Sequence, residues 1–165
     1  HMDEADLAQA AETNTKFVHC PTSNLFIGSG LFRLNETRQA GVDVMLGCDV
    51  GGGTSLSPFA TMKAAYEIAQ FSGYSLTPEE AFWLSTAGGA ETLSLGDKIG
   101  RLAPGYEADI VVIDVNSTPI IRQRMDRAET LRDELFAQMI LADDRAVRAT
   151  YAGGVRLHEK ARCGV

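Results

Sequence analysis

The sequence has few residues that bind metals and no motif that arranges them. Its 165 residues include three histidines and three cysteines, and it contains no CxxC, HxH or HExxH pattern. The cysteines, Cys20, Cys48 and Cys163, are odd in number and widely spaced, so they do not suggest a disulfide framework. They fit reduced thiols, so we expect a cytoplasmic protein. His1 is interpreted as a remnant of cloning, which leaves His19 and His158 as the histidines to explain.

Long apolar runs and an excess of basic residues are also absent. No apolar run approaches the roughly 20 residues that span a bilayer, and no signal peptide is visible at the start. The formal net charge is -7, which argues against nucleic-acid partners and against binding to anionic lipid. Apolar residues nevertheless make up 45% of the chain, so we expect a folded core rather than a disordered segment.

Strand and helix signals alternate along the first 90 residues. Residues 15–19 and 42–48 favour strands, and residues 21–24 between them favour a loop. Helices are predicted at 31–40, at 58–71 and from Thr77 to about Ala87, where Thr77, Pro78 and Glu80 suggest a capping box. This alternation is typical of an α/β arrangement with parallel strands.

The pattern changes in the last 70 residues. Short strands are predicted at 98–102 and 109–115, a helix at 120–142, and a β-hairpin at 147–158. We therefore divide the chain into an α/β part, residues 3–94, and a mostly β part with one packing helix, residues 95–165.

The strongest local candidate for chemistry is Asp49, which follows a predicted buried strand and precedes three glycines. An acidic residue at the carboxyl end of a strand is where α/β folds place ligand chemistry, although a turn-capping role explains it equally well. His19 and Cys20 follow the other strand. His19 is a candidate ligand or proton-transfer group and Cys20 a candidate nucleophile, while packing roles are the commoner explanation for both. Cys48 and Trp83 are expected in the core, and His158 on the surface.

Four segments carry a more specific signal. They are HCPTSNLFIGSGLFRL, GVDVMLGCDVGGGTSLSPFATMKAAYEIAQ, LAPGYEADIVVID and LADDRAVRATYAGG. Together they resemble the carboxyl-terminal part of the guanine deaminase family, within the metal-dependent amidohydrolase superfamily. The spacing of the HCPxSN loop from the strand-end aspartate is more diagnostic than a glycine-rich loop alone.

The resemblance implies the last strands and helices of a (β/α)8 barrel plus part of a small β-sandwich. Residues 15–20 and 42–48 would be the seventh and eighth barrel strands. The resemblance implies that Asp49 binds zinc or iron and shuttles the proton of the attacking water. It also implies that His19, Ser23 and Asn24 line the substrate pocket.

The family's HxH pair, its remaining metal histidines and its catalytic glutamate have no counterpart in this sequence. We therefore expect a fragment of a guanine aminohydrolase that is inactive by itself and holds no metal by itself. Guanine would be the substrate of the complete enzyme. Because two strands cannot close a barrel, we expect association with further copies or with a complementing amino-terminal half. The alternatives are a non-catalytic module that self-associates, and a fragment of another amino-heterocycle or chlorotriazine hydrolase.

Overall fold

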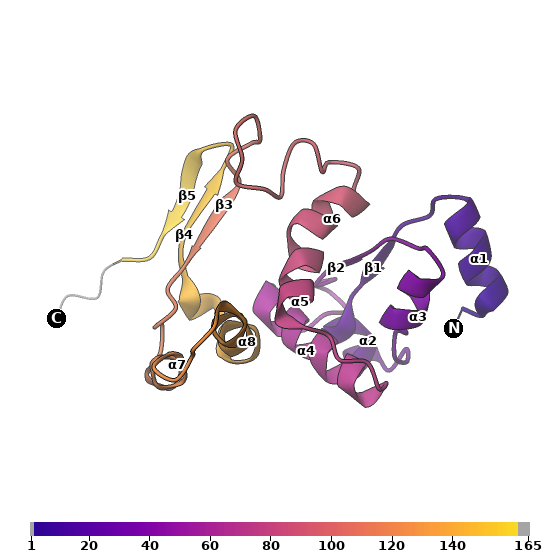
Figure 1. The fold of residues 1–165 in the computed structure, drawn as a ribbon, viewed down its shortest axis with the longest axis horizontal. Helices are drawn as coiled ribbons and strands as arrows, with labels where there is room; N and C mark the ends of the chain where they lie inside the picture. Colours follow the sequence, from indigo (N-terminus) through magenta and orange to yellow (C-terminus); the bar gives the residue numbers. More distant parts are fainter. Residues whose placement is uncertain (1, 162–165) are drawn as a thin grey trace.

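The computed structural model describes residues 2–161 and contains two β-sheets of different kinds (Figure 1). His1 and Cys163, discussed above, lie outside these residues. In the first sheet β1 (Phe17–His19) pairs with β2 (Val44–Leu46) in parallel. The second sheet is antiparallel and has the strand order β3-β4-β5. The α/β class predicted from the sequence is confirmed.

Helices cover the parallel pair and link it to the second sheet (Figure 1). Helix α8 packs against α4 and α5 and so joins the two parts of the chain. The helical segments are α1 (Glu4–Glu12), α2 (Pro21–Ile27), α3 (Leu34–Gln39), α4 (Pro58–Phe71), α5 (Pro78–Ser85), α6 (Ala87–Thr92), α7 (Pro119–Met125), α8 (Leu131–Leu141) and the 3-10 turn η1 (Asp144–Ala146). No helix within residues 2–161 is long and apolar enough to cross a membrane.

The main core lies between the parallel pair and helices α4 and α5. Val44 and Leu46 of β2 are buried and belong to one cluster with Phe59 and Met62 of α4 and Leu84 of α5. The register pairs Phe17 with Val44 and His19 with Leu46, so these residues share the face that meets the helices. Both strands were predicted, but each is three residues long: β1 begins at Phe17 rather than at residue 15, and β2 covers only Val44–Leu46 of the predicted 42–48.

Residues 21–24 form the first turn of α2, so the loop predicted there is wrong. Proline at the first position of a helix loses no hydrogen bond, because the first amide groups of a helix have no partner inside it. The turn-forming composition of Thr22, Ser23 and Asn24 is equally compatible with a helix start. The helix ends at Gly28, which has the left-handed φ of 69° common at this position.

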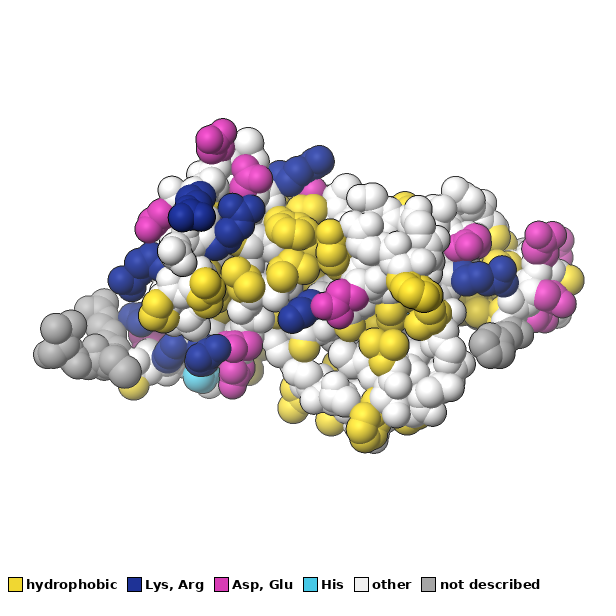
Figure 2. All heavy atoms as spheres, turned by 90° about the horizontal axis from the view of Figure 1, so that it is seen from below, with side chains coloured by type: hydrophobic (Ala, Val, Ile, Leu, Met, Phe, Trp, Pro, Cys, Tyr) yellow, Lys and Arg dark blue, Asp and Glu magenta, His cyan; other side chains and the backbone are white. Residues whose placement is uncertain are grey.

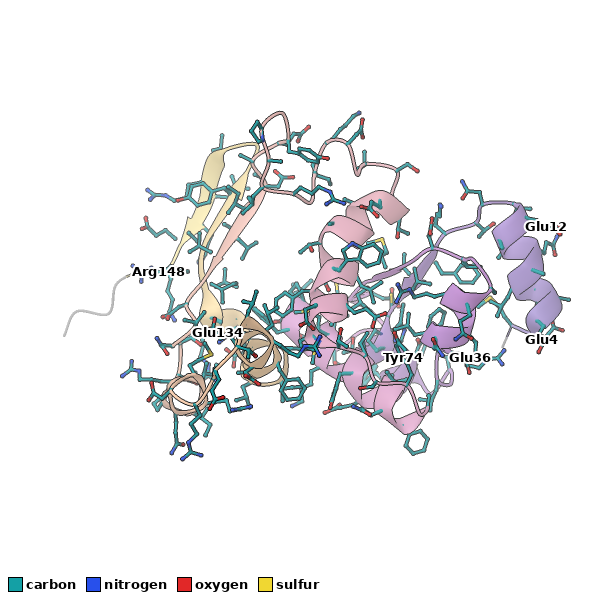
Figure 3. The ribbon with its side chains drawn as sticks, viewed as in Figure 1. Glu4, Glu12, Glu36, Tyr74, Glu134 and Arg148 are labelled. Atoms are coloured by element: carbon teal, nitrogen blue, oxygen red, sulfur yellow. The ribbon has the colours of Figure 1, made fainter. Side chains whose placement is uncertain are left out.

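The prediction of α4 is confirmed from Pro58 to Phe71, and α5 begins at Thr77 as expected. Only half of the predicted capping box forms. The Thr77 hydroxyl accepts the amide of Glu80 at 3.3 Å, but the Glu80 carboxylate turns to other partners. It accepts the Tyr74 hydroxyl at 2.7 Å and pairs with Arg38 (Tyr74 is labelled in Figure 3). Because Glu80 pairs with Arg38 of α3, its carboxylate does not bond the Thr77 amide as a capping box requires.

Trp83 is 38% exposed rather than fully in the core. Its ring lies against Gly88, where a Cβ atom would approach the indole to 2.5 Å, so only glycine leaves room at this position. The guanidinium of Arg38 lies 5.7 Å from the centre of the ring, within cation–π range. Gly88 and Gly89 are buried inside α6, where α5 and β2 approach closely.

Two predictions in the second part are wrong. Residues 98–102 form turns instead of a strand, and Gly100 has a φ of +87° that an extended strand does not allow. Residues 120–142 form two helices rather than one. Thr118 and Thr130 each cap a helix start through the side-chain oxygen, so the chain begins a new helix at Leu131.

The hairpin and the strand at 109–115 are confirmed as β3 (Ile110–Ile113), β4 (Val147–Ala152) and β5 (Val155–Glu159). Every residue of β5 is exposed, including Val155, Leu157 and His158. Figure 2 shows apolar side chains at the surface of both parts of the molecule, seen from below. Exposed apolar surface is therefore not confined to one region.

Candidate functional site

The carboxyl ends of β1 and β2 bring two predicted site residues together. Ser23, in the first turn of α2, donates a hydrogen bond from Oγ to Oδ2 of Asp49 at 2.7 Å. Asp49 follows β2 by three residues, and β1 and β2 run in parallel, so both residues lie at one edge of the sheet. Ser23 is buried, whereas Asp49 is exposed. The polar site predicted at the strand ends is therefore assembled from two segments 26 residues apart.

The glycine-rich loop holds the backbone of Asp49. Asp49 has the left-handed φ of 46°, uncommon for a residue with a side chain. Its carbonyl oxygen accepts the amide groups of Gly52 at 3.1 Å and Gly53 at 2.5 Å. A Cβ on Gly53 would overlap the Cys48 carbonyl oxygen, and a Cβ on Gly52 would lie 2.6 Å from Ser23 Oγ. The glycines are therefore needed because the loop packs closely against the end of its own strand and against Ser23.

His19 lies on the core side of β1 and is 1% exposed. Its ring stacks on Phe32 with centroids 4.7 Å apart and 20° between the planes. Within residues 2–161, neither ring nitrogen has a hydrogen-bond partner. Burial without a partner disfavours the charged imidazolium and lowers the pKa of His19 to about 4. The neutral ring therefore packs as part of the core.

Cys20 is not prepared to act as a nucleophile. Burial raises the pKa of its thiol, and the nearby Asp49 carboxylate and Cys48 thiol raise it further. A nucleophilic cysteine needs the opposite shift, toward the thiolate. Cys20 and Cys48 are both free and half-buried. The hypothesis of cysteine-based chemistry is therefore not supported at this site.

Asn24 is half-buried and points into its own loop. Its side-chain amide donates to Ser29 Oγ at 2.9 Å, across the turn that ends α2. The sequence predicted Asn24 and Ser23 in one loop, but the helix separates their directions: Ser23 meets Asp49 and Asn24 meets Ser29. The proline at position 21 was the signal that a helix, not a loop, carries these residues.

A metal ion would find one suitable ligand here. The Asp49 carboxylate suits zinc or iron, but residues 2–161 contain no group of three or more His, Cys, Asp or Glu side chains that could hold an ion. A zinc site uses three or four protein ligands. The described residues therefore supply one ligand of such a site and do not complete it.

Comparison with known proteins identifies the family. The model of the amidohydrolase family matches residues 1–157. The chain belongs to the amidohydrolase family. Over 160 residues it is 42% identical to the guanine deaminase of Escherichia coli, a match that covers 97% of this chain and 36% of that protein. This amidohydrolase chain therefore spans little more than a third of the relative's length. Its resemblance to the carboxyl-terminal part of guanine deaminase is confirmed.

Solved structures give the same result. The E. coli guanine deaminase structure superposes on 98% of this chain with a TM-score of 0.95, which covers 38% of that structure. A guanine deaminase from C. acetobutylicum, with guanine bound in its active site, is 27% identical with a TM-score of 0.81 and covers 96% of this chain and 37% of its own. A zinc-bound adenosine deaminase from Xanthomonas campestris is 24% identical with a TM-score of 0.74 and covers 94% and 35%, and it supports the fold alone.

Proposed function

We propose that this chain is the carboxyl-terminal part of a guanine aminohydrolase, which converts guanine and water to xanthine and ammonia. The observation that carries the proposal is Asp49, fixed by Ser23 at a parallel strand end in a chain 42% identical to a guanine deaminase. In this proposal β1 and β2 are the seventh and eighth strands of a (β/α)8 barrel. Residues 3–94 are the barrel segment and residues 95–165 belong to a β-sandwich.

Asp49 has two roles in the proposal. Its carboxylate binds the metal, zinc or iron, and accepts the proton that the attacking water loses. An aspartate at the carboxyl end of a barrel strand is well placed for both roles, because ligands of barrel enzymes bind at that end. Asp49 is exposed within residues 2–161. In a complete enzyme its carboxylate would therefore be free to bind a metal ion whose other ligands come from the rest of the protein.

The other two predicted pocket residues, Asn24 and His19, have different roles in the proposal. In this proposal Asn24, which is half-buried, lines the wall of the pocket. His19 supports the wall from the core side, where it packs on Phe32. When bound, the metal would acidify a water molecule for attack on the purine carbon that carries the amino group. Because the described residues supply one ligand, we expect the 165-residue chain to be inactive alone.

The test compares the chain with the full-length protein that carries it. Each is purified, its zinc and iron are measured, and conversion of guanine to xanthine is followed by ultraviolet absorbance. We expect turnover and bound metal in the full-length protein only. Stoichiometric metal and guanine turnover in the isolated chain, lost in Asp49→Ala, would refute the expected inactivity. A full-length protein that binds metal but leaves guanine unchanged would refute the substrate.

A second candidate function is that of a non-catalytic module that self-associates. It is favoured by β1, whose Val18 is 50% exposed and which pairs with β2 alone among the described strands. An unpaired strand edge beside exposed apolar side chains promotes association between chains. Burial of this edge between copies, without metal, would distinguish the module from the enzyme fragment.

Size-exclusion chromatography with light scattering tests this alternative. We expect the isolated chain to form dimers or larger species at micromolar concentration. The matched variant Val18→Lys places a charge on the exposed face of β1 and is expected to shift the chain toward monomer. A monomeric wild-type chain at the same concentration would exclude self-association.

A further inference from the structure

Ser23 was expected to line the substrate pocket, but its hydroxyl hydrogen is already used. Ser23 is 2% exposed, and its Oγ donates to Asp49 Oδ2 at 2.7 Å. A serine hydroxyl has one hydrogen to donate, so the bond to Asp49 leaves none for a ligand. The acceptor is a carboxylate, which makes the bond stronger than one between neutral groups.

We propose that Ser23 is a positioning residue, which fixes the orientation of the Asp49 carboxylate and makes no contact with the substrate. The proposal rests on the function proposed above, because it assigns Ser23 a role through Asp49. Within residues 2–161 the structure gives no hydrogen bond to the other carboxylate oxygen of Asp49. One oxygen is therefore held by the protein, and the other is left for a metal ion or a proton.

Independent elements hold the two ends of this contact. Ser23 is part of α2, which packs against α4. Asp49 is held through its backbone by the amide groups of Gly52 and Gly53. With both backbones fixed, the Asp49 side chain can still rotate. The hydrogen bond from Ser23 restrains this rotation. Partners of this kind orient the ligands of metal sites and tune them.

Gly52 provides a second way to break the same bond. A Cβ built on Gly52 would lie 2.6 Å from Ser23 Oγ and 3.2 Å from Asp49 Oδ2. The first distance is too short, so the serine hydroxyl must rotate away to make room. Ser23→Ala removes the donor, whereas Gly52→Ala displaces it. The two substitutions are expected to have the same consequence for Asp49.

The experiment uses the full-length protein with the variants Ser23→Ala, Ser23→Cys, Gly52→Ala and the double variant Ser23→Ala/Gly52→Ala. Steady-state kinetics with guanine and zinc affinity by chelator competition are measured for each, after circular dichroism shows that it is folded. Ser85→Ala is the control, since the Ser85 hydroxyl donates to the Ala81 carbonyl oxygen within α5 and not to Asp49. Ser23→Cys keeps the side-chain size with a weak donor, so it tests the bond if Ser23→Ala does not fold.

We expect kcat or zinc affinity to fall about 10- to 100-fold in each single variant, with KM within about threefold of wild type. The double variant is expected to lose no more than either single variant, because both break one bond. A rise in KM with unchanged kcat would overturn the proposal, since it indicates substrate contact. Unchanged kcat and zinc affinity would also overturn it. If wild type does not deaminate guanine, the proposed function fails, and the comparison of zinc affinities still tests the role of Ser23.

Discussion

The two sheets of this chain differ in strand direction, in strand length and in the side chains that lie beside them. The parallel pair has three-residue strands whose core-facing side chains Val44 and Leu46 are buried, and the candidate site forms at its edge. The antiparallel sheet has longer strands and a tight hairpin, and β5 is exposed along its whole length. The candidate site therefore lies beside the sheet with the shorter strands, where a contact between distant segments, Ser23 with Asp49, positions the side chains.

The largest expected difference between the sheets concerns an aspartate beside each. Asp49→Asn in the full-length protein keeps the side-chain size and tolerates the left-handed backbone, but it removes the charge. Because the substitution removes a proposed metal ligand, we expect guanine turnover to fall by more than about 100-fold. The measurement is kcat/KM for guanine at saturating zinc.

Asp109→Asn is the matched control in the second sheet. The Asp109 carboxylate accepts the amide of Gly153 at 2.8 Å, so it has a structural partner and no place in the site. We expect turnover within twofold of wild type. Equal losses in both variants would contradict the assignment of chemistry to the parallel pair.

The next largest effect is the pH dependence of stability caused by His19. The folded chain holds the pKa of His19 at about 4, below the ordinary value of 6.5 in the unfolded chain. Between these values the unfolded chain binds a proton that the folded chain does not. The stabilisation is complete above pH 6.5 and is lost as the pH falls toward 4, by at most about 3 kcal/mol. Urea unfolding of the chain at pH 7 and pH 4 measures this.

His19→Phe removes the titrating group and keeps an aromatic ring against Phe32. Its free energy of unfolding should depend less on pH than that of wild type, although carboxylates titrate in both. If His19→Phe depends on pH as strongly as wild type does, the pKa of His19 is not lowered in the folded chain, and the prediction is wrong.

A glycine in a turn beside each sheet gives a third, smaller contrast. Gly53→Ala places a Cβ against the Cys48 carbonyl oxygen, so the loop must shift, at a cost of about 1–3 kcal/mol. Gly154→Ala meets Ala108 at an ordinary 3.8 Å and costs about 1 kcal/mol through its φ of +79°. Thermal unfolding of both variants checks the order. A larger loss in Gly154→Ala would reverse the comparison.

The last contrast concerns charged contacts, and its exposed ion pair has the smallest expected effect of all. Tyr74→Phe removes hydrogen bonds to the largely buried Glu80 carboxylate, and we expect a loss of about 1.5–3 kcal/mol. Arg156→Ala breaks the ion pair of Arg156 with Glu159 on β5, where both side chains are about half exposed. Such pairs contribute about 0–1 kcal/mol. Urea unfolding at low and moderate salt separates the two, since only the exposed pair is expected to weaken with salt.

The sequence predicted the regions where local pattern decides the structure. The helix from Pro58 to Phe71 has an apolar face and a terminal break at Gly73, and the hairpin has two β-rich runs around Gly153 and Gly154. Both were predicted from the local pattern of residue types. The helix at Pro21–Ile27 was missed because its residues also form turns, and its contacts with α4 stabilise it as a helix.

The candidate site was predicted in part. Asp49 and its glycine loop were found because a strand end followed by glycines is a local signal. The Ser23–Asp49 bond joins residues 26 positions apart, so no local pattern contains it. The sequence left the face on which His19 lies open, because strand alternation does not reveal which face meets the helices until the second strand is placed.

The contact between Trp83 and Gly88 gives this chain a built-in optical reporter. Trp83 is the single tryptophan of the sequence, so its emission needs no correction for other indoles. Its ring senses the approach of α6 through Gly88 and of α3 through Arg38. Fluorescence therefore follows the seating of these helices beside β2 without a label, and it does so independently of any catalytic assay.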